Sequence, residues 1–140
     1  MNLRYLITRL AQIGLIINGC INYSIKKLLS YLPTNIFLRP KLSKGCSASC
    51  DSYDCSNKIG FPSGHSQTIW FFITYLFLYH YKSNKKIIHF PTLFCLILLA
   101  TSISISRLGF FGSNICHSPI QVIVGSILGI ILAYYYFYIF

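Results

Sequence analysis

Apolar runs separated by short polar segments form the dominant pattern of this chain. Residues 10–25 form the first run, which contains two asparagines, and later runs extend from about Ser63 to Tyr81 and from about Ile87 to Ser106. The last run extends from Pro119 to the C-terminus. At about 1.5 Å per residue, the second run is long enough to cross most of a hydrocarbon layer about 30 Å thick. The pattern therefore predicts an all-α membrane protein, a bundle of about four transmembrane helices whose first helix is polar and imperfect.

The polar segments between these runs predict which side of the membrane each end faces. Residues 28–38 form a short amphipathic segment that Pro33 interrupts, and a polar loop of residues 41–60 follows it. The basic link of residues 82–86 indicates the cytoplasmic side, because cytoplasmic loops carry an excess of Lys and Arg. Residues 41–60 and a second long loop, residues 107–118, then lie together at the lumenal or outer face.

Composition supports one membrane domain, residues 1–140. Hydrophobic residues make up 54% of the chain and the mean hydropathy is +0.59, both higher than in a soluble domain of this size. Twelve basic residues face two acidic ones, Asp51 and Asp54, and the basic residues flank apolar runs, which favours a bilayer over nucleic acid as the partner. With two carboxylates, mechanisms based on carboxylate pairs or carboxylate metal cages are nearly excluded.

The six cysteines divide into two groups. Cys20 and Cys95 lie in apolar runs, where we expect small buried hydrophobic residues. The other four lie in the two polar loops and are Cys46, Cys50, Cys55 and Cys116. These four could form disulfides if the loops face an oxidising compartment, and the pairing is left open. Their spacing is too loose for a typical zinc site.

A Pro-Ser-Gly turn opens directly into the second apolar run. The stretch reads Gly60-Phe61-Pro62-Ser63-Gly64-His65-Ser66-Gln67. Ser63 is the expected N-cap of a helix, whose first N–H groups attract phosphate, and Gly64 lets an anion approach the backbone closely. His65 in the first turn could donate a proton to that anion. The alternative is a polar helix cap with an interfacial histidine.

Three further candidates fall at predicted helix ends on the same membrane face, and they are Arg39, Arg107 and His117. Two arginines can grip phosphate oxygens in bidentate fashion and neutralise charge in the transition state. Two histidines can divide the work of nucleophile and proton donor. Singly, each arginine could instead snorkel at a helix end and His117 could be a cap residue.

These residues resemble the motifs of the type-2 phosphatidic acid phosphatase superfamily. The resemblance covers about residues 20–138 and rests on Gly60–Ser66, on Arg39-Pro40 and on Arg107 with His117. Within the superfamily, the segments that begin at His65 and His117 most resemble the dolichyldiphosphatase branch. The middle motif is specific, and the other two are individually weak.

The resemblance implies a hydrolase for lipid phosphates at the membrane surface, with polyprenyl (dolichyl) diphosphate as the leading substrate and phosphatidic acid behind it. It implies that His117 is the nucleophile, forming a phosphohistidine, and that His65 is the general acid. The implied phosphate ligands are Arg39, Arg107, Ser63 and Gly64. It also implies that no metal or other cofactor is required, and it makes the endoplasmic reticulum the first expectation for the membrane, with another cellular membrane left open.

One departure from the family's pattern concerns a lysine. The family's first motif has a lysine where Leu32 stands, and Lys26 or Lys27 could fill the role if the following segment contains an insertion. We name Lys27 as the candidate phosphate ligand. A second departure is the separation of Arg107 from His117 by nine residues, more than the family commonly has.

The third departure is Gln121, which stands where the family commonly has Asp, although the dolichyldiphosphatase branch resembles this chain in having Gln. Ser118 and Gln121 also form a capping-box pattern with Pro119 at the first helical position. Gln121 is therefore either a cap alone or a cap that also orients His117. A glutamine cannot stabilise an imidazolium as a carboxylate does, so a slower enzyme is expected.

Two other functions remain open. One is a membrane protein that binds haem or another metal through His65 with His117, or through His80 with His89. The other is a catalytically silent member of the family that binds lipid phosphate. Because the helical core is smaller than is usual in this family, the chain could be a minimal version, a homodimer that completes its lipid groove, or a fragment.

Overall fold

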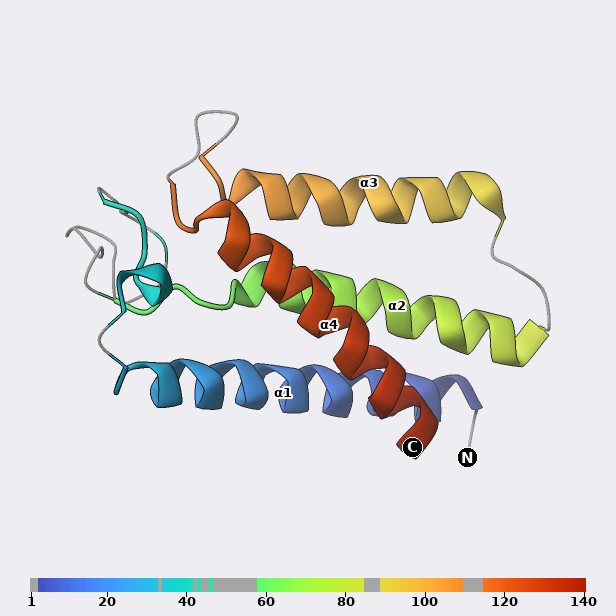
Figure 1. Cartoon of the computed structure of the whole chain (residues 1–140). Helices are drawn as coiled ribbons and strands as arrows, with labels where there is room; N and C mark the ends of the chain where they lie inside the picture. Colours follow the sequence, from blue (N-terminus) through green and yellow to red (C-terminus); the bar gives the residue numbers. More distant parts are fainter. Residues whose placement is uncertain are drawn as a thin grey trace.

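The computed structural model describes residues 3–32, 34–41, 43, 46, 58–84, 89–109 and 115–140, apart from the side chains of residues 3–9 and 84. Regular secondary structure in these residues is entirely helical (Figure 1). The elements are α1 (Leu3–Leu29), the 3-10 turn η1 (Asn35–Phe37), α2 (Gly64–Asn84), α3 (Phe90–Ser106) and α4 (Pro119–Ile139). The prediction of an all-α fold with four helices is confirmed for this part of the chain.

The helices are arranged so that one end of the molecule collects the polar segments. Figure 1 shows α2 between α1 and α3, with α4 crossing α2 obliquely. The C-terminal ends of α1 and α3, the N-terminal ends of α2 and α4, and η1 all lie at the same end. Four segments that are distant in sequence therefore meet there, as the hydrophobic pattern predicts.

The first helix is longer than predicted. Helix α1 continues through Lys26 and Lys27 to Leu29, so the prediction of a separate amphipathic segment over residues 28–38 is wrong. Lysine and leucine are good helix formers, and no helix breaker occurs before Pro33. Only the short turn η1 follows before Arg39.

The other helix boundaries differ from the predictions by a few residues. Helix α2 extends three residues beyond the predicted end at Tyr81. Helix α3 begins at Phe90, with a proline in its first turn, and ends at Ser106 as predicted. Helix α4 begins at Pro119 as predicted.

Helices α2 and α4 are in backbone contact through glycines. A Cβ atom added to Gly125 would lie 2.6 Å from the Ser63 carbonyl oxygen, and one added to Gly129 would collide with the Gln67 carbonyl oxygen. Small residues at a four-residue spacing let two helices approach closely. This packing brings the first turn of α4 against the loop that leads into α2, and so positions the polar end.

Replacing Gly125 with Leu should therefore separate α4 from α2. The new side chain would meet backbone atoms, which cannot rotate away. We therefore expect the free energy of unfolding to fall by about 1–3 kcal/mol, as is typical of overpacking. The loss would appear as a lower midpoint of thermal unfolding in detergent. The control is Ile127→Leu, because Ile127 on the same helix is 52% exposed. Equal midpoints for the two variants would contradict this account.

Exposed apolar side chains cover much of the helical surface. Helix α4 is the one described helix that is both long and apolar enough to cross a membrane, and α3, with 17 residues, is a shorter apolar helix. A four-span bundle is therefore not established by these helices. The prediction that Cys20 and Cys95 are buried is wrong, since both are exposed.

Candidate active site

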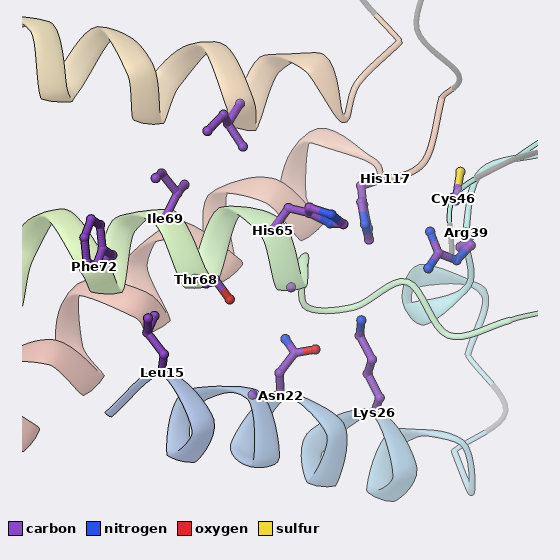
Figure 2. Close-up of a pocket in the computed structure, with 13 residues that line it drawn as sticks. Leu15, Asn22, Lys26, Arg39, Cys46, His65, Thr68, Ile69, Phe72 and His117 are labelled. Atoms are coloured by element: carbon purple, nitrogen blue, oxygen red, sulfur yellow. The ribbon is translucent and has the colours of Figure 1, made fainter. Parts of the chain in front are cut away.

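A cavity of about 710 Å³ lies at the polar end and extends between α1, α2 and α3. Its charged end is lined by Lys26, Arg39, His65 and His117 (Figure 2). Lys26 comes from the last turn of α1, His65 from the first turn of α2, and His117 from the segment just before α4. In Figure 2 the His65 ring points toward His117.

His117 is held in place by the chain around Arg107. The backbone N–H groups of Cys116 and His117 both donate to the Arg107 carbonyl oxygen at 3.0 Å. Leu108 and Ile115 form an isolated antiparallel bridge immediately beyond, and Gly109 has a φ of 85°. Since the two ends of the loop are tied together at its base, the extra length between Arg107 and His117 does not separate these residues.

Gln121 is completely buried and contacts two parts of the site. Its Nε2 donates to the carbonyl oxygens of Ile36 (3.2 Å) and Leu38 (2.7 Å), which positions the turn before Arg39. Its Oε1 accepts from the backbone N–H of Ser118 at 3.3 Å, and lies 3.2 Å from His117 Nδ1. Gln121 thus makes its own half of the predicted capping box, with the Ser118 N–H, and also contacts His117.

These contacts determine the tautomer of His117. Because the amide nitrogen of Gln121 is directed at two carbonyl acceptors, its oxygen must be the atom that faces His117. An acceptor opposite Nδ1 requires the proton on Nδ1, so the neutral ring carries its lone pair on Nε2.

Arg39 is 9% exposed and is anchored to the segment that carries His117. Its Nη1 donates to the Cys116 carbonyl oxygen at 3.1 Å, and its backbone N–H donates to Lys58. A disulfide between Cys46 and Cys116 ties the same two segments together. This pairing answers the question that the sequence leaves open for these two cysteines; Cys50 and Cys55 lie outside the described residues.

The N-terminus of α2 faces a lysine from α1. A Cβ atom added to Gly64 would lie 3.8 Å from Lys26 Nζ, so this ammonium group sits beside the first turn of α2. Both features attract anions. Lys26 therefore reaches the cavity, whereas Lys27, the candidate named from the sequence, is exposed and does not line it.

Two other predicted ligands are not on the cavity wall. Ser63 is completely buried, accepts a hydrogen bond from the Ser66 hydroxyl at 3.1 Å, and does not line the cavity. Arg107 does not line it either, but its charge adds to the effect of burial in lowering the pKa of His65. The Nε–H groups of Arg39 and Arg107 are buried without a hydrogen-bond partner among the described residues.

Sequence reasoning missed an amide network that joins α1 to α2. Gln67 Nε2 donates to the side-chain and backbone oxygens of Asn18 (2.9 and 3.1 Å), and Asn22 donates to Gln67 Oε1 (2.7 Å). The network sets the rotation of α1. The predicted first helix ended at residue 25. If the prediction had continued the helix, the four-residue spacing from Asn22 would have placed Lys26 on the same face as Asn22.

Positive charge at the site is not balanced by any carboxylate side chain in the described part of the chain, because both acidic residues lie outside it. Burial, followed by the charges of Arg39 and Lys26, lowers the pKa of His117 to about 3, although the Gln121 contact acts in the opposite direction. Burial also lowers the pKa of His65 and lowers that of Lys26 to about 8. The site is therefore suited to an anion, with His117 neutral near pH 7.

The described residues contain no group of three or more His, Cys, Asp or Glu side chains placed to hold a metal ion. The polar atoms that converge on the cavity are mainly cationic or neutral hydrogen-bond donors. This donor set matches phosphate oxygens.

Comparisons with known proteins identify the family of this chain. Residues 9–140 match the PAP2 superfamily. A curated relative, "Dolichyldiphosphatase 1" of Dictyostelium discoideum, is 30% identical over 130 residues, which cover 89% of this chain and 48% of that protein. The chain thus spans about half the length of this relative. No solved structure matches significantly. Since the family match extends over nearly the whole chain, and over every residue of the site, this protein belongs to the PAP2 superfamily.

Proposed function

We propose that this protein is a membrane lipid phosphatase that hydrolyses a polyprenyl diphosphate, such as dolichyl diphosphate, through a phosphohistidine on His117. The observation that carries the proposal is the contact between Gln121 and His117 Nδ1, which leaves the Nε2 lone pair free beside a cluster of cations. Phosphate is the ligand that this cluster suits best. Family membership supports the same class of reaction.

In the first step, His117 Nε2 attacks phosphorus and a P–N bond forms as the P–O bond to the leaving group breaks. His65 donates its proton to the departing oxygen. Arg39 and Lys26 would neutralise the charge on the phosphoryl oxygens, with Gly64 N–H at the helix N-terminus, and Arg107 would add its positive charge from outside the cavity wall. Gln121 would hold the imidazole with its Nε2 toward phosphorus. We assign Ser63 to positioning this loop, and give Lys27 no role.

In the second step, water replaces His117 on phosphorus. His65, now neutral, accepts a proton from the water as its oxygen bonds to phosphorus and the P–N bond breaks. Inorganic phosphate leaves, His117 regains its Nε2 lone pair, and His65 is again protonated. No metal takes part in this scheme.

The test is phosphate release from polyprenyl diphosphate and from phosphatidic acid by membranes that contain the protein, with EDTA present. We expect turnover that survives chelation, and an acid-labile phosphorylated protein when a 32P-labelled substrate is quenched rapidly. Turnover that EDTA abolishes would contradict the metal-free scheme. Binding of the lipid without any turnover would instead indicate a catalytically silent family member.

As the pH rises, kcat/KM should fall in two steps. His65 must be protonated to act as an acid, and its pKa is lowered from 6.5. As the pH rises, kcat/KM should therefore begin to fall at a pH below 6.5, where His65 loses its proton. Lys26 should produce a second fall near pH 8, where its charge disappears and phosphate binding weakens. Full pH profiles would measure both.

Matched variants separate the two losses. Lys26→Arg keeps the charge and should remove the second fall, whereas His65→Ala should remove the first along with most of the activity. A flat profile from pH 5 to 9 in the unmodified protein would contradict both assignments.

We also propose that α1, α2 and α3 cross the membrane with α4, and that the site faces an oxidising compartment such as the lumen of the endoplasmic reticulum. The disulfide beside His117 supports this orientation. Lys41 is exposed, and a Lys41→Cys variant that also lacks Cys20, Cys50, Cys55 and Cys95 should react with an impermeant maleimide only from the lumenal side. Reaction from the cytoplasmic side would reverse the orientation.

A further inference from the structure

The cavity that holds the proposed phosphate site continues well beyond it. Past Lys26 and His65 it is lined by Leu15, Gly19, Thr68, Ile69, Phe72 and Ile103. Leu15 lies eleven residues before Lys26 on α1, which corresponds to about 16 Å along the helix. At about 710 Å³ the whole cavity is comparable to pockets of about 300–1,000 Å³ that hold drug-sized ligands. A phosphate group would fill only its charged end.

This extension is a groove with a defined floor and two walls. The floor is the face of α2 that carries Thr68, Ile69 and Phe72, at spacings of three and four residues. That face is turned away from α4, which packs against the face carrying Gln67. One wall is α1 and the other is α3, through Ile103, and Figure 2 shows the apolar side chains extending along the helices away from His117.

Gly19 leaves the α1 wall open at the middle of the groove. It lines the cavity, and a Cβ atom added there would meet no atom within 4 Å. Gly14, five residues earlier on the same helix, is the opposite case, because a Cβ atom there would lie 2.8 Å from Tyr136. A side chain at Gly19 would therefore enter the groove without disturbing the packing of the helices.

We propose that a single hydrocarbon chain of the lipid substrate lies in this groove, and that Gly19 determines how thick a chain can pass. The charged end and the apolar groove form one continuous cavity, so one molecule with a phosphorylated end and one long chain matches both parts. A lipid with two acyl chains would need a second path for its second chain. This inference rests on the proposed phosphatase function.

The test is a series of Gly19→Ala, Gly19→Leu and Gly19→Phe variants, each assayed with a long polyprenyl diphosphate and with a short, water-soluble prenyl diphosphate. For the long substrate, kcat/KM should fall progressively with side-chain size, by at least about tenfold for Leu, comparable to the discrimination from filling an apolar pocket. For the short substrate it should stay within about twofold, which also shows that the variants fold. Cys20→Leu is the matched control, because Cys20 is exposed on α1 and does not line the groove.

Two other results would overturn the inference. Equal effects of Gly19→Leu on both substrates, or on neither, would show that the chain does not pass this residue, while leaving the phosphatase function intact. A higher kcat/KM for phosphatidic acid than for polyprenyl diphosphate would exclude the single-chain assignment. If the unmodified protein hydrolyses none of these lipids, the proposed function fails, and this inference fails with it.

Discussion

Replacing His117 with Ala should abolish phosphate release from polyprenyl diphosphate. His117 is the one buried imidazole among the described residues that line the cavity, and its contact with Gln121 fixes the position of its proton. Loss of a covalent nucleophile typically lowers kcat by about 10⁴-fold or more. The phosphorylated intermediate should disappear together with turnover.

The control for this variant is His89→Ala, because His89 is exposed at the N-terminal end of α3, which lies at the opposite end of the molecule from the polar end (Figure 1). It should keep near-normal activity. Substrate binding to His117→Ala should persist, since the cations of the site remain. Activity within tenfold of the unmodified protein, in a folded His117→Ala variant, would refute the phosphohistidine scheme and favour direct attack by water.

Replacing Gln121 with Leu should have the second largest effect, on stability and on catalysis together. The change leaves the carbonyl oxygens of Ile36 and Leu38 without their amide donor. Each buried polar group left unpaired costs about 1–3 kcal/mol, so a marked fall in the midpoint of thermal unfolding is expected. Without its acceptor, His117 can also adopt the tautomer with the proton on Nε2, which should lower kcat by about 10²-fold or more.

The matched control for Gln121→Leu is Gln67→Leu. Gln67 is equally buried and makes a similar number of hydrogen bonds, but these join α1 to α2 and do not touch His117. Both variants should lose stability, measured by thermal unfolding in detergent. Only Gln121→Leu should lose kcat at a temperature where both are folded. Equal kcat for the two variants would show that Gln121 is a structural cap only.

The sequence alone was sufficient to predict the helices and the groups that meet at their ends. Apolar length defined α2, α3 and α4 to within a few residues, because burial or a bilayer requires long apolar segments whatever their partners are. Four residues were predicted to meet at one face; Arg39, His65 and His117 line one cavity, whereas Arg107 does not line it. This meeting follows from topology, since consecutive helices that alternate in direction bring every second end to the same side.

The tertiary structure was needed for every choice that depends on helix rotation and on partners distant in sequence. Whether Lys26 or Lys27 faces the cavity depends on the rotation of α1, which the contacts of Asn22 with Gln67 determine. Cys46 pairs with Cys116 because Arg39 and the base of the second loop bring their segments together. Gln121 fits its capping box equally well with or without His117, and only the position of the Ile36 and Leu38 carbonyl groups orients its amide. Such contacts join residues more than forty positions apart, and no local pattern of polar and apolar residues encodes them.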